Sequence, residues 1–169
     1  MRTTVVTLLV VVLVAASAAA QGWKVFKSDR FGFAMLVAPG MEWEARDFGS
    51  GWGGIAAEKG VFEFRAICKK GEHSDVAKME QTAVDVTGIP ATAWTKIDEG
   101  IGRRDGLGAN GWSFWRTYLA KNSRTHRMVY AVLGHGPHGS YLLLLGTTEA
   151  DYVAHESLYQ QWYRSLTVF

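Results

Sequence analysis

The sequence predicts an α+β fold: an antiparallel sheet with helices packed on it. Three observations lead to this prediction. Short segments with strand-like patterns follow one another through most of the chain, and most are joined by short turns. One segment after residue 74 changes to helical spacing, and a second helical segment lies near the C-terminal end. Strands joined by short turns pair antiparallel, because a parallel pair needs a long crossover connection.

The first twenty residues read as a secretory signal peptide. Arg2 gives a positive start, the segment 5–16 is apolar apart from Thr7, and four small residues at 17–20 match the pattern that signal peptidase accepts. The segment is shorter than the ~20 apolar residues of a membrane-spanning helix. We therefore expect cleavage after Ala20 and a periplasmic or secreted protein without stable membrane insertion. An uncleaved N-terminal anchor is the alternative.

Residues 21–169 have the length of a single domain. A domain of this size buries enough surface to fold without a metal or a disulfide. The formal net charge of the whole chain is only +2. Binding to nucleic acid requires a clustered basic excess, so this class of partner is not expected. For the same reason, electrostatic adhesion to an anionic membrane is not expected.

The N-terminal half contains the first group of predicted strands. Their ranges are 23–26, 31–37, 41–48, 55–58 and 61–68. Turn-forming residues separate them, including the glycine-rich segment 49–54. The last of these strands alternates most clearly, with Phe62, Phe64, Ala66 and Cys68 on one face.

A helix is predicted between Ser74, as its N-cap, and Gly88. The apolar side chains of Val76, Met79, Ala83 and Val86 recur at helical spacing and form one stripe. Strands are then predicted at 94–99, 112–120, 126–133 and 141–146, with a flexible glycine-rich connection at 100–111. Residues 141–146 are apolar on both faces, so this strand should be covered on both sides.

The last helix is predicted from Thr148 to about Ser165. Thr148 with Asp151 three residues later is a capping pattern. The predicted buried stripe consists of Tyr152, His155, Tyr159, Trp162 and Leu166.

The two ends of the chain resemble the PsbP-like superfamily, whose fold also occurs in a nuclear-import factor that binds the Ran GTPase. The resemblance lies in residues 26–33 and 37–43, and in 141–146, Asp151-Tyr152 and 159–169. It implies a central antiparallel sheet sandwiched by helices, an α/β/α sandwich, with residues 166–169 as a terminal strand. Members of this superfamily are mostly extracytoplasmic accessory or binding proteins without enzymatic activity.

Cys68 is the only cysteine, so the chain cannot form an internal disulfide. Its phase in the predicted strand places the thiol in the core, where free cysteine is common. A disulfide with another chain is the alternative.

His135 and His138 are the candidate metal ligands. They lie three residues apart in a glycine-rich turn. A zinc or copper site needs three or four converging ligands, so this pair is half of a site. A solvated turn is the simpler interpretation, and we expect no cofactor.

A hydrolase is a further alternative, with Ser50 or Cys68 as the nucleophile. Ser50 lacks the glycines two positions away on each side that a nucleophile elbow requires. Cys68 is predicted to be buried, whereas a reactive cysteine is partly exposed.

Trp52, Arg103 and Arg104 are the candidate partner-binding residues. Trp52 is flanked by glycines, and an exposed tryptophan in a turn is typical of an interface. The alternative is that the Trp52 side chain folds back over a sheet edge. Arg103 and Arg104 lie in the 100–111 connection, where they could meet an acidic partner or be solvated.

The sequence thus favours an extracytoplasmic, non-enzymatic binding or assembly-accessory protein, with an envelope protein as its expected partner. A metal-binding protein using His135 and His138, or a small envelope hydrolase, are the alternative classes.

Overall fold

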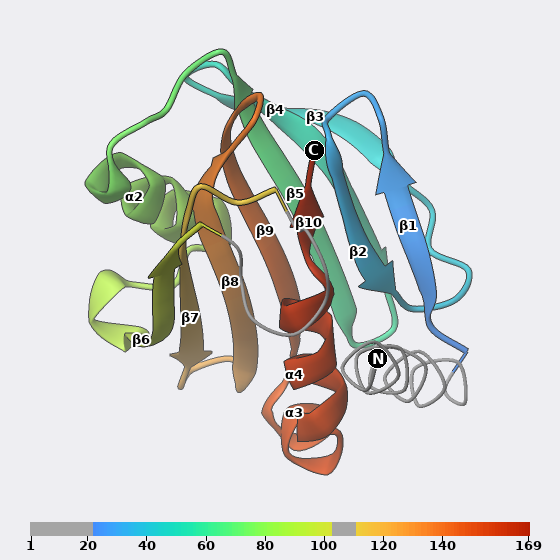
Figure 1. Cartoon of the computed structure of the whole chain (residues 1–169). Coiled ribbons are helices and arrows are strands. Elements are labelled where there is room, and N and C mark those ends of the chain that lie inside the picture. Colours follow the sequence, from blue (N-terminus) through green and yellow to red (C-terminus); the bar gives the residue numbers. More distant parts are fainter. Residues whose placement is uncertain (1–21, 103–110) are drawn as a thin grey trace, which may run out of the picture.

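The computed structural model describes residues 22–102 and 111–169 (Figure 1). The predicted signal peptide, residues 1–20, lies outside the described residues. The described residues form two antiparallel sheets. The smaller sheet has the order β1-β2-β10, with bounds Lys24–Ser28, Phe33–Val37 and Thr167–Val168. The larger sheet has the order β3-β4-β5-β9-β8-β7-β6.

The strands of the larger sheet follow the predicted ranges closely. Their bounds are Glu44–Gly49 (β3), Trp52–Lys59 (β4), Phe62–Lys70 (β5), Trp94–Ile101 (β6), Phe114–Asn122 (β7), Arg127–Gly136 (β8) and Gly139–Thr148 (β9). The described helices are α2 (Val76–Thr87), a short 3₁₀ helix (Ala91–Ala93), α3 (Glu149–Ala154) and α4 (Glu156–Ser165).

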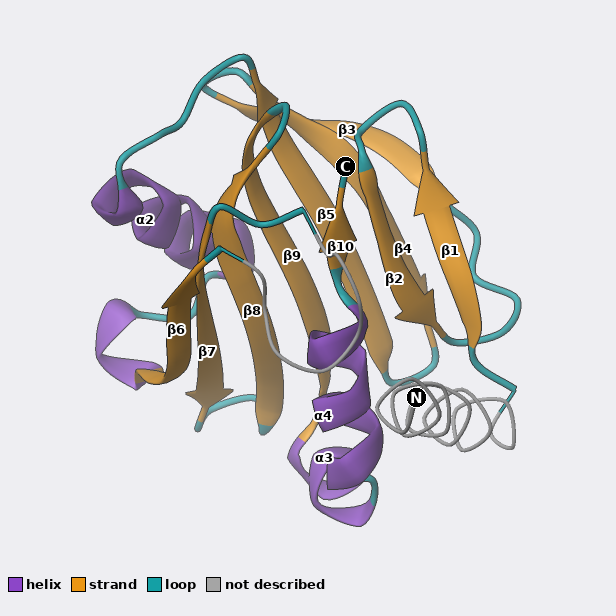
Figure 2. Cartoon of the chain, viewed as in Figure 1, coloured by secondary structure: helices purple, strands orange, loops and turns teal. Residues whose placement is uncertain are grey.

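The larger sheet is covered on both faces. Helix α2 packs on one face, whereas the smaller sheet and helix α4 lie over the other (Figure 2). Strand β9 lies at the centre, between β5 and β8, and all of its residues but the last are buried. The prediction that this strand is covered twice is therefore confirmed.

The predicted α/β/α sandwich is correct only in part. The fold is α+β and its sheets are antiparallel, but strands rather than helices predominate. A second sheet supplies much of the cover on one face: Phe33, Met35 and Val168 from the smaller sheet belong to the core on that side. The C-terminal strand expected from the PsbP-like resemblance is β10, and it pairs with β2.

Strand β5 separates the two faces of the larger sheet. Phe64, Ala66 and Cys68 belong to the core under the smaller sheet, and Ile67 belongs to the core under α2. Glu63 and Arg65 share the phase of Ile67, so the alternation places two charged side chains on the α2 face.

Helix α2 begins one residue later than predicted. Its N-cap is Asp75, which makes no side-chain cap hydrogen bond, so Ser74 is not the cap. The backbone N–H of Ser74 instead donates to Oγ of Ser140 in β9 (2.7 Å). The predicted stripe is correct: Met79 and Ala83 are buried, and Val76 and Val86 pack against the same core.

The predicted C-terminal helix is divided into α3 and α4 at His155. This residue leaves the helical conformation (φ −132°, ψ 30°) and its side chain is exposed, so it is not part of the buried stripe. The expected cap is present, because Oγ1 of Thr148 accepts the N–H of Asp151 at 3.1 Å. Tyr159, Trp162 and Leu166 are buried as predicted.

No helix in ranges 22–102 and 111–169 combines the length and the apolar character needed to span a bilayer.

Candidate functional site

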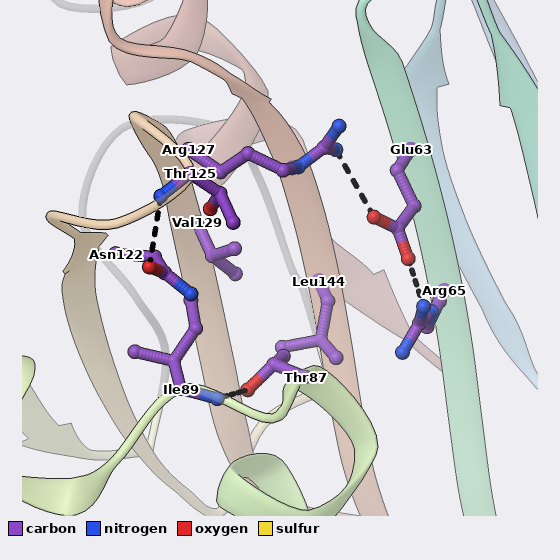
Figure 3. A pocket seen from close by; sticks show the side chains of 10 residues that line it. Glu63, Arg65, Thr87, Ile89, Asn122, Thr125, Arg127, Val129 and Leu144 are labelled. Carbon is purple, nitrogen blue, oxygen red and sulfur yellow. Dashed lines mark hydrogen bonds and ion pairs between the residues drawn. The ribbon is translucent and has the colours of Figure 1, made fainter.

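A pocket of about 170 Å³ lies on the α2 face of the larger sheet, beside the C-terminal end of the helix (Figure 3). We call it the arginine pocket. Strands β5, β8 and β9 form its floor, and the end of α2 and the turn between β7 and β8 form its walls. The residues that line it are Glu63, Arg65, Thr87, Ile89, Asn122, Thr125, Arg127, Val129, Leu144 and Gly146.

An ion-pair chain of three residues crosses the floor of the pocket. Oε1 of Glu63 pairs with Nη2 of Arg65, and its Oε2 pairs with Nη2 of Arg127 at 3.0 Å. Glu63 and Arg65 come from β5, whereas Arg127 begins β8. The chain therefore reaches across the intervening strand β9.

Gly146 makes this crossing feasible. It is in register with Glu63 on one side and with Val129 on the other. A Cβ atom at Gly146 would lie 3.0 Å from Nη2 of Arg127 and 3.4 Å from Oε2 of Glu63. The missing side chain leaves the space in which the carboxylate and the guanidinium meet.

Arg65 also connects the floor to helix α2. Its Nη1 donates to the carbonyl oxygen of Val86, one of the last carbonyls of the helix, which lack a partner within the helix. Gly88 ends the helix in the left-handed conformation (φ 66°). The helix therefore ends beside the arginine. Nε of Arg65 is buried and has no hydrogen-bond partner in the described structure.

The opposite wall is a turn closed by Asn122. Oδ1 of this residue accepts the N–H groups of Arg124 (3.1 Å) and Thr125 (3.2 Å). Because the amide oxygen already accepts two bonds, the amide nitrogen is the group that Asn122 can offer to a ligand.

The charges of the pocket do not balance, since two guanidinium groups face one carboxylate. The three charged side chains are 20% to 35% exposed, so a ligand can reach them. Val129, Leu144 and Ile89 add a small apolar area. Hydrogen-bond donors around a net positive charge fit a carboxylate attached to a short apolar chain.

The sequence patterns did not predict the arginine pocket. The alternation of β5 indicated its apolar face, and no role was inferred for the charged residues on the opposite face. Two signals were available in the sequence: Glu63 and Arg65 two residues apart in a strand, and Gly146 inside an otherwise apolar strand.

Trp52 has the second of its two predicted placements. It is the first residue of β4, and its side chain is only 4% exposed. It belongs to the core under α2, together with Ile67 and Met79. An exposed position for Trp52 is therefore wrong, because the glycine-rich turn folds the indole back onto the sheet.

Arg103 and Arg104 lie outside the described residues. Gly100 and Ile101, predicted as part of the same connection, belong to β6.

His135 and His138 have different surroundings. His135 is inside β8, and its Nε2 donates to the carbonyl oxygen of Ser74 at 2.9 Å. Its ring stacks on His73, with centroids 4.7 Å apart. His138 is exposed in the turn between β8 and β9. The described residues contain no cluster of three or more histidine, cysteine, aspartate or glutamate side chains suited to a metal ion.

The two candidate nucleophiles are structurally distinct. Cys68 is buried and unpaired, and burial raises the pKa of its thiol. Its partner in the β5–β9 register is Tyr141, whose hydroxyl lies near the thiol. Ser50 lies in the turn between β3 and β4 with φ 51°. Neither residue lines the arginine pocket.

Comparison with solved structures identifies the fold. The chain is similar to the solution structure of cyanobacterial PsbP (CyanoP) from Synechocystis sp. PCC 6803, with a TM-score of 0.57. The similarity covers 87% of this chain and 92% of that chain, at 14% sequence identity. The fold is thus PsbP-like, as the resemblance at the two ends of the sequence implies. No protein-family model and no curated protein matches the chain.

Proposed function

We propose that this protein is an extracytoplasmic, non-enzymatic binding protein with an accessory or assembly role, and that the arginine pocket is its binding site for a carboxylate group. The imbalance of charge in the pocket carries the proposal: Arg65 and Arg127 face the single carboxylate of Glu63. The PsbP-like fold supports the general class, and the sequence of residues 1–20 supports export.

The pocket favours binding rather than catalysis. Among its described lining residues there is no histidine, cysteine or serine, the side chains most often used as nucleophile or general base. Arginine keeps its charge at all ordinary pH values and forms forked hydrogen bonds with carboxylates. The carboxylate of a ligand would add a second anion between the two guanidinium groups and balance their charge.

Calorimetric titration of the purified protein with butyrate tests the proposal, with butylammonium as the probe of opposite charge and equal chain length. We expect butyrate to bind and butylammonium not to bind. Arg127→Gln should weaken butyrate binding by about tenfold, because it removes one charge-assisted hydrogen bond.

Arg124→Gln is the matched control. Arg124 is an exposed residue of the same turn, but it does not line the pocket. Equal affinity of the wild type and Arg127→Gln for butyrate, or equal binding of both probes, would contradict the proposal.

A further inference from the structure

A second concave surface lies at the opposite end of the larger sheet. Three connections form it: the turn between β1 and β2, the segment after β5, and the turn between β8 and β9. We call it the cationic hollow. Its volume is about 620 Å³, and it is lined by Asp29, Arg30, Phe31, Gly32, Lys70, Gly71, His73, Pro137, His138 and Gly139.

Basic side chains predominate in the cationic hollow. Arg30 and Lys70 both lie over the ring of Phe31, with the Arg30 guanidinium carbon 5.1 Å and the Lys70 ammonium nitrogen 5.8 Å from its centroid. Lys70 also donates to the carbonyl oxygen of Arg30, which ties β5 to the turn between β1 and β2. The aromatic ring thus contacts two cationic side chains at the surface.

The nearby carboxylates already have partners. Asp29, the one acidic residue that lines the hollow, pairs with Lys27 at 2.8 Å. Glu72 pairs with Lys69 at 3.0 Å. Among the described residues, neither Arg30 nor Lys70 has a carboxylate within ion-pair distance. The hollow therefore has cationic charge that no acidic side chain of the described chain compensates.

Two histidines also line the hollow. Nε2 of His73 contacts the carbonyl oxygen of Gly136 at 3.1 Å, and because a carbonyl only accepts, this nitrogen carries the hydrogen. His138 is exposed in the turn between β8 and β9, and its carbonyl oxygen accepts the N–H of Gly71 at 2.9 Å.

The buried hydroxyl group of Tyr141 lies beneath the floor of the hollow. Tyr141 is fully buried, and a Cβ at Gly32 would lie 3.1 Å from its hydroxyl oxygen and 3.4 Å from the ring of His138. The Cys68 thiol and the backbone of His138 lie close enough to influence the pKa of the hydroxyl, but neither forms a hydrogen bond of normal geometry with it. This donor is therefore unsatisfied below two lining residues of the hollow.

We propose that the cationic hollow binds a phosphomonoester group, either on a soluble molecule or on a lipid headgroup. A phosphomonoester is a compact anion of nearly two charges with three acceptor oxygens. Arginine, lysine and histidine donors arranged around a concave surface match this charge and these acceptors. The arginine pocket has a carboxylate at its centre and a smaller volume, and it does not offer this combination.

Titration with phenyl phosphate, followed by calorimetry and by amide chemical shifts, tests the proposal on the purified protein. Because the hollow is open to solvent, we expect a dissociation constant on the order of 1 mM or lower. The shifted amides should lie at residues 29–32, 70–73 and 138–139. Arg30→Gln should weaken binding about tenfold, and His138→Ala should weaken it severalfold, because each substitution removes a hydrogen-bond donor from the hollow.

Arg46→Gln is the control, since Arg46 is an exposed cation on β3 that does not line the hollow. Binding to vesicles with phosphatidic acid, but not to neutral vesicles, would assign the group to a lipid; binding only to phenyl phosphate would assign it to a soluble molecule. No saturable binding, or equal affinity of the wild type and Arg30→Gln, would overturn the proposal. Arg127→Gln should leave phenyl phosphate binding unchanged, so this outcome is separate from that of the arginine pocket.

Discussion

Gly146 and Gly134 show how the same substitution has different costs at two positions of the central strands. At Gly146, an added Cβ would press on the mobile end of Arg127. At Gly134, it would lie 2.1 Å from the backbone oxygen of Phe114, which cannot move away without displacing β7. We expect Gly146→Ala to cost under about 1 kcal/mol and to weaken butyrate binding. Gly134→Ala should cost about 2 kcal/mol or more.

Urea unfolding of both variants and butyrate titration of Gly146→Ala measure these effects. A large loss of stability in Gly146→Ala would mean that the space above β9 is needed for folding rather than for the ion-pair chain.

Tyr118 and Tyr141 make stability dependent on alkaline pH. Burial raises the pKa of each hydroxyl to about 12, and the hydrogen bond to Glu80 contributes to the rise for Tyr118. The folded state thus holds these protons more tightly than the unfolded state, whose tyrosines titrate near pH 10. Their contribution is complete below pH 10 and is lost as pH rises through 12.

We therefore expect the free energy of unfolding to fall between pH 10 and 12, by up to about 2 kcal/mol per tyrosine. Urea unfolding at pH 9 and pH 11 measures the fall. Tyr141→Phe should make it smaller, and an unchanged pH dependence in this variant would contradict the assignment.

The capping of α3 can be tested at the scale of the element. Thr148→Ala removes the acceptor of the Asp151 N–H, so the variant should lose about 1 kcal/mol of stability. Urea unfolding measures the loss. Thr82→Ala is the control, because Thr82 lies inside α2, where its hydroxyl donates to Lys78 and caps no helix end. A loss of similar size in the control would show that the cap is not responsible.

Most elements could be predicted from the sequence because they depend on local periodicity. Strand β5 and helix α2 have clear patterns, and the cap at Thr148 depends on two residues three positions apart. Contacts distant in sequence decided the rest. The burial of Trp52 depends on its packing in the core under α2. The helix break at His155 could not be predicted, because the helical spacing of the stripe continues through this residue.

The arginine pocket could not be predicted for the same reason. Glu63 and Arg127 meet only because β5 and β8 flank β9, and the strand order of the sheet is not apparent from strand patterns. Similarly, His73 in the segment after β5 stacks on His135 of β8, which lies far from it in the sequence.

At the scale of the whole molecule, export is the property to test. The sequence predicts removal of residues 1–20, so N-terminal sequencing of protein from the extracytoplasmic fraction should begin at Gln21. Retention of Met1 on the protein in that fraction would favour the uncleaved anchor. An alanine replaced by a bulky residue at the cleavage site, Ala20→Trp, should leave the precursor uncut.

Strand β5 extends from the arginine pocket to the cationic hollow. Glu63 lies near its beginning and Lys70 at its end, seven residues apart, so about 23 Å of extended backbone separates them. Each end of this strand is anchored in a different group of connections, and the two recognition surfaces share no lining residue. A ligand in one surface therefore need not obstruct a ligand in the other. A single copy of the chain thus has the geometry of an adaptor that can hold a carboxylate at one end of β5 and a phosphate at the other.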